Sequence, residues 1–394
     1  MESPRKNKTL FIDKEALFAL YLCKEGLLAP INHLMNENEM QQSEKNQILP
    51  LSFILAPAGK RNQEILQNVS KGETLSLICD HQVCGELVVD STFCIDKKQR
   101  LMRITGGDIY SKKAQDIYKR LGDFAVCGDY ELYPQITYPI NKGIKETILQ
   151  IKKNIQASSI TAMMLDVSPI TRIHERIFRL ILDENELLVL FLFKKQKEDL
   201  LSFQIRKQCL EYVIENYLPK NRIIIFPLND IYLFEGTHGI LLNAIISQNL
   251  GCDKMVIGET HPNLAFYYEK QKVYSVFDTT KEIKIKIKFL SEFVYCQQCK
   301  TIVSVKTCPH GKHHHINYHT RFIQGILQSG LIPPTILVRK EVSAKILAYL
   351  FPNRFSNLIK QFGTMFADNG IIAEQNEEDF YIKLSLLYQT HSLN

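Results

Sequence analysis

The sequence lacks tryptophan, internal repeats and low-complexity tracts over its 394 residues. It also lacks any apolar run of about 18 residues, which argues against a membrane-spanning helix. The first residues, MESPRKNKTLFID, have no apolar core of the kind found in signal peptides. We therefore expect a cytoplasmic protein with no membrane partner.

Charge of one sign is also scarce, because the formal net charge is only +6. This excess is too small and too dispersed to indicate a nucleic-acid-binding protein, although it suits anionic small molecules. With 45% hydrophobic and 23% charged residues, the composition is that of an ordinary globular protein. The length predicts two or three domains that can bury large cores.

The ten cysteines fall into two groups. Seven are scattered, and in a cytoplasmic chain we expect these to be reduced thiols. They are Cys23, Cys79, Cys84, Cys94, Cys127, Cys209 and Cys252. The other three cluster within residues 296–308, a spacing that favours metal binding.

The N-terminal part combines one helix with a β-rich section. A helix is expected over residues 13–25, ending at Gly26 in the C′ position. Residues 47–135 contain short β-rich runs separated by turn residues, which predicts a small barrel or bent sheet. A short helix over 109–121 interrupts this section. A polar helix within 136–157 marks a plausible domain boundary.

Strands and helices alternate beyond residue 157. This alternation predicts a doubly wound parallel sheet. Strands are expected over 160–167, 187–193, 222–228 and 254–258, helices over 169–182, 199–217, 238–249 and 263–271, and a further strand over 282–290. Residues 320–394 are expected to be mostly helical. We therefore divide the chain into segments 1–150, 151–318 and 319–394.

Residues 158–182, SSITAMMLDVSPITRIHERIFRLIL, have the pattern of a buried strand followed by an amphipathic helix. Ser168 is a good helix N-cap and Pro169 suits the first helical position. Helix N-termini at the carboxyl end of a parallel sheet bind anions, especially phosphates. Thr171 and His174 lie on the first turns of the helix, so we expect a nucleotide to bind here.

Two later turns share this position between a strand and a helix. GETHPN begins at Gly258 and contains His261, and a glycine turn with a histidine is a good nucleotide contact. A histidine that merely caps the turn is about as frequent. EGTHG contains Gly236, which could let the backbone approach a ligand, although loop glycines are common.

The strongest local motif is CQQCKTIVSVKTCPHGKHHH at residues 296–315. Cys296, Cys299 and Cys308 with one histidine would form a closed tetrahedral zinc site of the structural type. The alternative is a set of metal-free cysteines beside a solvated histidine run. Spacing does not decide the fourth ligand among the histidines, and we choose His310. The other candidates are His313, His314 and His315.

Five segments, in order along the chain, resemble the ATP sulfurylase (sulfate adenylyltransferase) family, including its zinc-bearing branch. They are GLLAPINHLMNENEM, CGDYEL, NLGCDKMVIGETH, YCQQCKTIVSVKTCPHG and ILQSGLIPPTILVRKEVSAKIL. The resemblance covers almost the whole chain. It implies a PUA-like β-rich N-terminal domain, a nucleotidyltransferase-like α/β domain with the zinc-binding insert, and a helical C-terminal segment. It also makes a homo-oligomer plausible.

The resemblance implies a reaction in which sulfate attacks the α-phosphorus of ATP, forming adenylyl sulfate and releasing pyrophosphate. ATP would bind with magnesium, and catalysis would rest on positioning and on positive charge near the phosphates. Carried onto this sequence, His174 and Thr171 would be catalytic. The nucleotide-binding positions would be Val167, Ser168, Pro169, Gly236, Gly258 and His261.

This chain departs from the family at those motifs. The first family motif reads Gln-x-Arg-Asn-Pro-x-His-x-x-His, and only Pro169 and His174 agree with it. The differing positions are Leu165 for Gln, Val167 for Arg, Ser168 for Asn and Thr171 for the first His. In the second family motif, Gly-Arg-Asp-His, the position of the arginine is occupied by Glu259 in this chain. The Ala-Gly-Pro-Arg-Glu loop corresponds to Glu235–Gly239, and the following helix has Asn243 and Ser247 for a histidine and an arginine.

Two of the lost arginines are those at Val167 and Glu259, and each such donor typically contributes about 10²–10³ in rate. Three hypotheses follow. The first is a sulfate adenylyltransferase-like protein with an altered site, which binds ATP or another adenine nucleotide. The second is a non-catalytic nucleotide-binding or interaction protein on the same scaffold. The third is nucleotidyl transfer to an acceptor other than sulfate, with charge supplied by Lys194, Lys195, Arg172 or Arg206.

Overall fold

The computed structural model describes residues 8–46, 52–133, 143–194, 200–229, 236–269, 272–365 and 375–389. The chain forms two compact units. One consists of Met1–Ala162 and Leu228–Phe289, and the other of Met163–Pro227 and Leu290–Asn394. None of the helices in the described ranges combines the length and the apolar character needed to cross a membrane.

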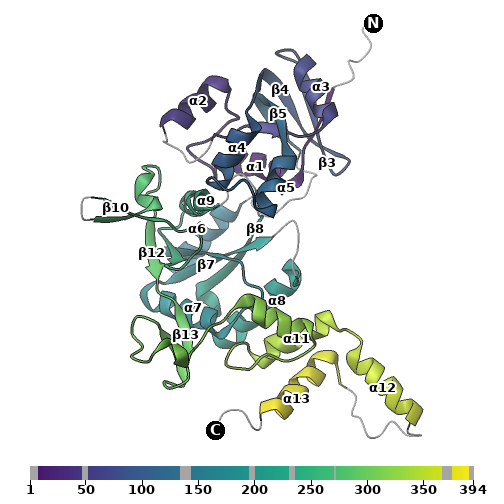
Figure 1. The fold of residues 1–394 in the computed structure, drawn as a ribbon, viewed down its shortest axis with the longest axis vertical. Coiled ribbons are helices and arrows are strands. Elements are labelled where there is room, and N and C mark those ends of the chain that lie inside the picture. Colours follow the sequence, from purple (N-terminus) through teal and green to yellow (C-terminus); the bar gives the residue numbers. More distant parts are fainter. Residues whose placement is uncertain are drawn as a thin grey trace. The chain divides into compact units, whose positions relative to one another are not determined.

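The first unit contains a five-stranded sheet with the order β1-β3-β4-β5-β2 (Figure 1). Its strands are β1 (Lys8–Phe11), β2 (Leu55–Pro57), β3 (Thr74–Cys79), β4 (Gln82–Cys94) and β5 (Leu121–Leu132). β1 pairs with β3 in parallel, and the other pairings are antiparallel. Shifts in register interrupt three of these pairings, and such bulges bend a sheet. A β-rich section is therefore present where the sequence predicts one.

Five helices accompany this sheet: α1 (Lys14–Lys24), α2 (Glu37–Asn46), α3 (Lys60–Asn68), α4 (Lys97–Thr105) and α5 (Lys112–Arg120). α1 and α5 match the expected helices. α1 is capped by the Asp13 side chain, and Gly26 follows its end with φ of 70°. The prediction of strands alone between α2 and α5 was wrong for α3 and α4. α3 has no side-chain cap, so its start carries no sequence signal of the usual kind.

Asn62 fixes α3 to the edge of the sheet. This buried side chain accepts a hydrogen bond from the Phe11 N–H at 2.9 Å. Its amide nitrogen donates to the carbonyl oxygens of Phe11 and Ala58 at 2.8 and 2.7 Å. One polar side chain thus satisfies backbone groups of β1 and of the turn that leads from β2 into α3, which is how α3 is held at this place.

A second sheet has the order β12-β9-β6-β7-β8. Its strands are β6 (Ile160–Leu165), β7 (Leu187–Lys194), β8 (Ile223–Asn229), β9 (Lys254–Gly258) and β12 (Lys286–Leu290). Because β6, β7 and β8 are neighbours joined through helices, they run parallel. Residues 187–192 of β7 are completely buried, as expected of a strand covered on both faces. The order reverses at β6, where β9 joins on the other side, so the sheet is doubly wound as predicted.

The helices of this region are α6 (Ile144–Asn154), α7 (Arg172–Glu184), α8 (Phe203–Tyr217) and α9 (Thr237–Asn249). The prediction of a helix over 263–271 was wrong. Residues there form the strand β10 (Phe266–Glu269), which pairs antiparallel with β11 (Lys272–Ser275). The aromatic side chains Tyr267 and Tyr274 lie opposite each other in this ribbon, and such cross-strand aromatic pairs favour strands.

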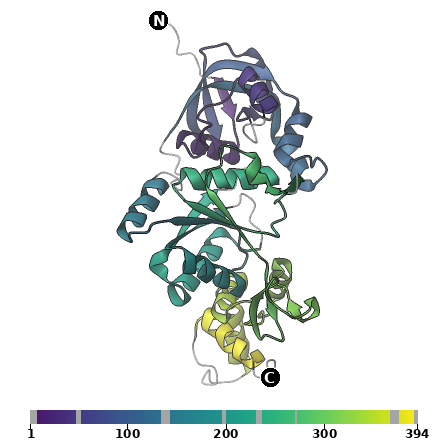
Figure 2. The same ribbon diagram turned by 90° about the vertical axis from the view of Figure 1, so that its left-hand side faces the viewer.

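The C-terminal part of the second unit begins with a small antiparallel sheet in the order β14-β13-β15. Its strands are β13 (Phe293–Cys296), β14 (Thr301–Ser304) and β15 (His315–Ile316). Four helices follow: α10 (Thr320–Gln328), α11 (Lys340–Leu350), α12 (Arg354–Met365) and α13 (Glu377–Gln389). α11 packs against α13 (Figure 2). Short 3₁₀ turns occur at Lys220–Arg222, Val276–Thr279 and Lys312–His314.

We predict that Asn62→Ala destabilises the fold by about 2–4 kcal/mol, because three hydrogen bonds are lost and buried backbone groups are left without partners. Urea unfolding of the full-length chain measures the change. The matched control is Gln67→Ala, an exposed position on the same helix, which should change stability by less than about 0.5 kcal/mol. Equal stability of both variants would contradict the role given to Asn62.

Candidate functional site

The turn after β6 differs from the one that the sequence predicts. Ser168 is not the helix N-cap, because its backbone carbonyl and its hydroxyl both accept hydrogen bonds from the Gln324 amide at 3.0 Å. Pro169, which follows a cis peptide bond, is not the first helical residue. α7 starts three residues later, at Arg172, with Thr171 as its N-cap.

A capping box between Thr171 and His174 explains this later start. His174 Nδ1 accepts a hydrogen bond from the Thr171 backbone N–H at 3.0 Å and lies 2.8 Å from Thr171 Oγ1. The Thr171 side chain in turn caps the backbone N–H of His174. His174 thus occupies the N3 position, where a capping box usually has Glu or Gln, and accepts the same hydrogen bond. The two residues predicted to be catalytic are therefore in direct contact.

His174 is held as a neutral imidazole. Its Nδ1 acts as an acceptor, so the proton of the neutral ring lies on Nε2. The ring retains some solvent exposure, but desolvation by the surrounding protein lowers its pKa to about 4. At neutral pH it therefore offers one N–H donor without adding positive charge.

The N-terminus of α7 is largely paired within the protein. The backbone N–H of Arg172 donates to the Leu337 carbonyl at 2.9 Å, and those of Thr171 and His174 are engaged in the capping box. The side chains at two of the altered motif positions, Leu165 and Val167, are buried at 3% and 2% exposure. A phosphate at this turn would therefore depend on the His174 Nε2–H more than on the backbone.

A buried ion-pair cluster holds α7 in place. Glu175, 5% exposed, receives two hydrogen bonds of 2.7 Å from the Arg339 guanidinium, and Arg172 lies 3.2 Å from the same carboxylate. Arg339 also stacks on the Tyr217 ring, with 3.2 Å between its Cζ atom and the ring centroid. Burial alone would lower the pKa of Arg339, but the bonds from Glu175 outweigh it and the pKa is raised.

Of the other cations that the sequence offers, Arg206 lies at the ends of β6 and β7. Its guanidinium donates to the Phe193 carbonyl at 2.8 Å and lies 3.4 Å from Asp166. Because Arg206 is buried and already paired, it is not an open anion-binding group. Lys194 ends β7, and Lys195 lies outside the described residues.

The turn after β9 also contains a histidine whose Nδ1 accepts a backbone hydrogen bond, as His174 does. His261 Nδ1 accepts a hydrogen bond from the Asn263 backbone N–H at 3.2 Å, so its neutral form also carries the proton on Nε2. Burial lowers the pKa of His261. Its backbone closes the turn through a 3.0 Å bond to the Gly258 carbonyl. A Cβ on Gly258 would meet no atom within 4 Å, which leaves open space beside the turn.

In the EGTHG motif, Gly236 and His238 have structural roles at the start of α9. Gly236 has φ of 59° and ψ of −135°, a conformation that favours glycine. His238 Nδ1 donates to the Arg103 carbonyl at 2.9 Å, which ties α9 to the end of α4. Glu235 lies outside the described residues. In α9, Ser247 is completely buried, so a position that holds arginine in the family has no room for one here.

The four residues predicted to bind metal lie together. The ligand atoms of Cys296, Cys299, Cys308 and His310 all lie within 4.8 Å of one another. His310 Nδ1 is 3.4, 3.3 and 3.7 Å from the three sulfur atoms, and the sulfurs of Cys299 and Cys308 are 3.9 Å apart. Tetrahedral zinc, with bonds of about 2.3 Å to sulfur and about 2.0 Å to nitrogen, sets S···N and S···S separations of about 3.5 and 3.8 Å.

The local backbone also prepares this cluster for metal. Desolvation opposes ionisation of Cys296, but N–H groups of Cys299 and Gln298 outweigh it, and the pKa of Cys296 is lowered to about 7. Thiolates are the form that binds metal. His315 Nε2 lies 3.3 Å from Cys308 Sγ. Among the described residues, His310 is therefore the histidine that best fits a fourth ligand, while His315 flanks the cluster.

The lowered pKa of His174 predicts a pH dependence of stability. Between pH 4 and 6.5 the unfolded chain protonates this residue and the folded chain does not. The stability is therefore complete above pH 6.5 and falls as the pH drops toward 4. The shift corresponds to about 3 kcal/mol. His174→Gln keeps a capping-box acceptor but does not titrate, so it should lose less stability than the parent chain over this range. Parallel losses in urea unfolding at each pH would contradict the assignment.

Comparison with known proteins identifies the family. The model of the ATP-sulfurylase family matches residues 144–349, which is more than half of the chain. A sulfate adenylyltransferase from Carboxydothermus hydrogenoformans is 26% identical over 351 residues, covering 86% of this chain and 91% of that protein. One from Chlorobaculum tepidum is 25% identical over 296 residues, covering 71% of this chain and 72% of that protein.

A solved structure shares the fold. A hexameric APS kinase from Thiobacillus denitrificans superposes with a TM-score of 0.64 at 16% identity, over 88% of this chain and 64% of that one. The family model, the curated relatives and the strand order agree with the predicted resemblance. This chain belongs to the ATP-sulfurylase family.

Proposed function

We propose that this protein binds ATP and acts as a nucleotidyltransferase of the sulfate adenylyltransferase type. The observation that carries the proposal is His174, which accepts a backbone hydrogen bond at Nδ1 and keeps Nε2–H as a donor. It follows β6, the strand at which the sheet order reverses. Turns after such strands are where doubly wound sheets bind nucleotides.

The reaction requires positioning more than proton transfer. Sulfate oxygen attacks the α-phosphorus of ATP, a new oxygen–phosphorus bond forms, and the bond to pyrophosphate breaks. The neutral Nε2–H group of His174 would bind a phosphate oxygen and orient it. Thr171 would hold the His174 ring in the required tautomer. Magnesium would enter with ATP and neutralise phosphate charge.

A second candidate is nucleotide binding without sulfate adenylylation, either without any catalysis or with another acceptor. The observation that favours it is the loss of cationic groups. Val167 is buried and apolar, Glu259 replaces an arginine of the family, and Arg206 is already paired. A neutral or cationic acceptor would suit these substitutions better than the sulfate dianion.

The zinc-binding branch of the family is part of the proposal. Cys296, Cys299, Cys308 and His310 would hold one zinc ion, and the donor set and separations fit it. Four protein ligands leave no open coordination position, so the metal would stabilise the three-stranded sheet and would not take part in the reaction.

By analogy we also propose a PUA-like N-terminal domain and the sequence division at residues 150 and 318. We propose a homo-oligomer because the APS kinase from Thiobacillus denitrificans, which shares the fold, is hexameric.

We predict that the full-length protein binds MgATP in calorimetry and that His174→Ala weakens binding about tenfold or more, because one hydrogen bond to a charged group contributes about 1.5–3 kcal/mol. His33→Ala, at an exposed histidine paired with Glu39, is the matched control and should bind like the parent chain. Pyrophosphate release is then measured with sulfate and with molybdate.

The outcomes separate the candidates. Release of pyrophosphate that depends on sulfate or molybdate and is lost in His174→Ala supports sulfate adenylylation. ATP binding without such release supports the second candidate. If the folded parent chain shows no binding of ATP at all, both candidates are wrong.

For the metal, we predict one zinc ion per chain by elemental analysis of gently purified protein. Cys296→Ser or Cys308→Ser should lose both the metal and thermal stability, because metal binding and folding are coupled. Cys94→Ser is the control, since Cys94 is an exposed thiol away from the motif. Protein that is folded and active in ATP binding but contains no metal would contradict this prediction.

A further inference from the structure

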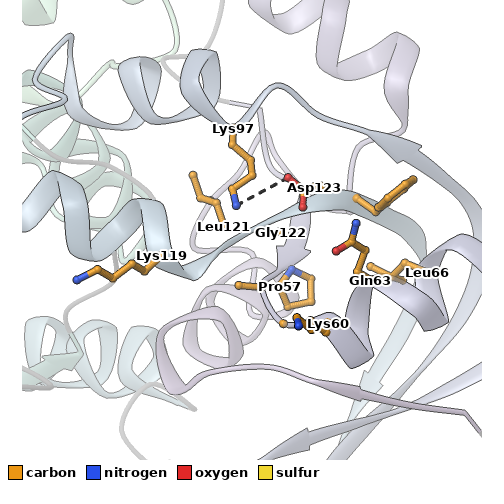
Figure 3. Close-up of a pocket in the computed structure, with 12 residues that line it drawn as sticks. Pro57, Lys60, Gln63, Leu66, Lys97, Lys119, Leu121, Gly122 and Asp123 are labelled. Atoms are coloured by element: carbon orange, nitrogen blue, oxygen red, sulfur yellow. Dashed lines mark ion pairs between the residues drawn. The ribbon is translucent and has the colours of Figure 1, made fainter.

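A cavity of about 260 Å³ lies in the first unit, within the N-terminal β-rich part (Figure 3). It is lined by the turn from β2 into α3, by α3 itself, by Lys97 and Lys119 from α4 and α5, and by the start of β5. Leu66, Leu121 and Phe124 supply apolar wall. Its volume is slightly below that of typical ligand sites, about 300–1,000 Å³, so a bound compound would have to be small.

The polar groups of the cavity are mainly donors. Lys60, Lys97 and Lys119 line it, and Asp123 is the acidic residue among its described lining. Lys97 Nζ is 3.8 Å from Asp123, a long ion pair that leaves donor capacity on the ammonium group. In Figure 3, Lys119 extends away from the other labelled side chains, and its ammonium group is 3.6 Å from Asp116. Lys97 also lies over the Tyr118 ring, with 4.9 Å from its Nζ atom to the ring centroid. Lys60 is therefore the more available cation, and Lys97 would contribute the donor capacity that these contacts leave.

The first turn of α3 lines the cavity and carries positively charged side chains at the positive end of the helix. This arrangement is electrostatically unfavourable when no anion is bound. Its N-cap Gly59 has φ of 115° and offers no side chain to cap the helix. The first turn contains Lys60 and Arg61 and no acidic residue, whereas the positive end of a helix favours anions. Arg61 contacts Thr9 and Phe11. Lys60 forms no ion pair or hydrogen bond within the described part of the chain.

An unused amide adds to this arrangement. Gln63, one turn further along α3, lines the cavity and is partly buried. Its side chain forms no hydrogen bond with the residues that the structure describes. A polar group in that position gains stability when a ligand supplies the missing partner. The two lysines and this amide thus all offer hydrogen-bond donors to a ligand in the cavity.

We propose that this cavity binds the phosphate or sulfate group of a small organic anion. Lys60 and Lys97 would neutralise the oxyanion, Gln63 would donate to it, and the apolar walls would contact the organic part. A small cavity with apolar walls fits such a compound better than a nucleic-acid strand, which requires an extended basic surface. The proposal does not depend on the proposed nucleotidyltransferase function.

The test measures binding of inorganic phosphate, ribose 5-phosphate and a single-stranded RNA oligonucleotide to the full-length chain by calorimetry at fixed ionic strength. Lys60→Glu and Lys97→Gln should each weaken ribose 5-phosphate binding about tenfold or more, the size of effect expected when one charge-assisted hydrogen bond is lost. The matched control is Lys98→Gln, an exposed lysine next to Lys97 that does not line the cavity. A second control, His174→Ala, separates this site from the proposed nucleotide contacts.

The unfolding midpoint of Lys60→Glu shows whether a loss of binding results from a loss of folding. A carboxylate in the first turn of α3 suits the helix dipole, so the unfolding midpoint without ligand should stay the same or rise while ligand binding is lost. Equal binding by Lys60→Glu, Lys97→Gln and Lys98→Gln overturns the proposal, as does loss of binding in His174→Ala alone. Binding of RNA that depends on Lys60, without binding of either small anion, also overturns it.

Discussion

The buried carboxylate of Glu175 is the constraint on which the second unit depends. A charge with 5% exposure is stable only when it is paired and hydrogen-bonded, and Arg339 meets it with two bonds of 2.7 Å. This pair joins the first turn of α7 to the residue that caps α11. Because His174 precedes Glu175 directly, the same pair fixes the histidine on which the proposed nucleotide contact rests.

The structure gives a consistent account of how the site differs from its family. Neutral imidazoles remain at His174 and His261, whereas family arginine positions are now buried, acidic or filled by a small side chain, as at Val167, Glu259 and Ser247. Binding of a nucleotide needs donors, which are still present. Binding of a second dianion needs positive charge, which is reduced. Under the proposed function, the nucleotide contacts would thus be better preserved than the acceptor contacts.

Buried strands and cysteine spacing were predictable because each depends on residues close in sequence. The apolar run of β7 and the cluster of Cys296, Cys299, Cys308 and His310 are examples. The start of α7 was not, because Ser168 is engaged by Gln324, 156 residues away, and a histidine completes the cap at Thr171. α3 lacks a cap, and the aromatic ribbon β10–β11 has a composition that also suits a helix face. The Glu175–Arg339 pair spans 164 residues, so no local pattern indicates it.

The central claim is that His174, a neutral histidine with Nδ1 as acceptor and Nε2–H as donor, contacts a nucleotide. Nitrogen-15 NMR of the histidine rings of the full-length protein tests this most directly, because it reports both the tautomer and the contact. The account predicts that His174 is a neutral Nε2–H tautomer at pH 7 and that its Nε2 resonance shifts when MgATP is added. A protonated ring at pH 7, or a resonance unchanged at saturating MgATP, would contradict it.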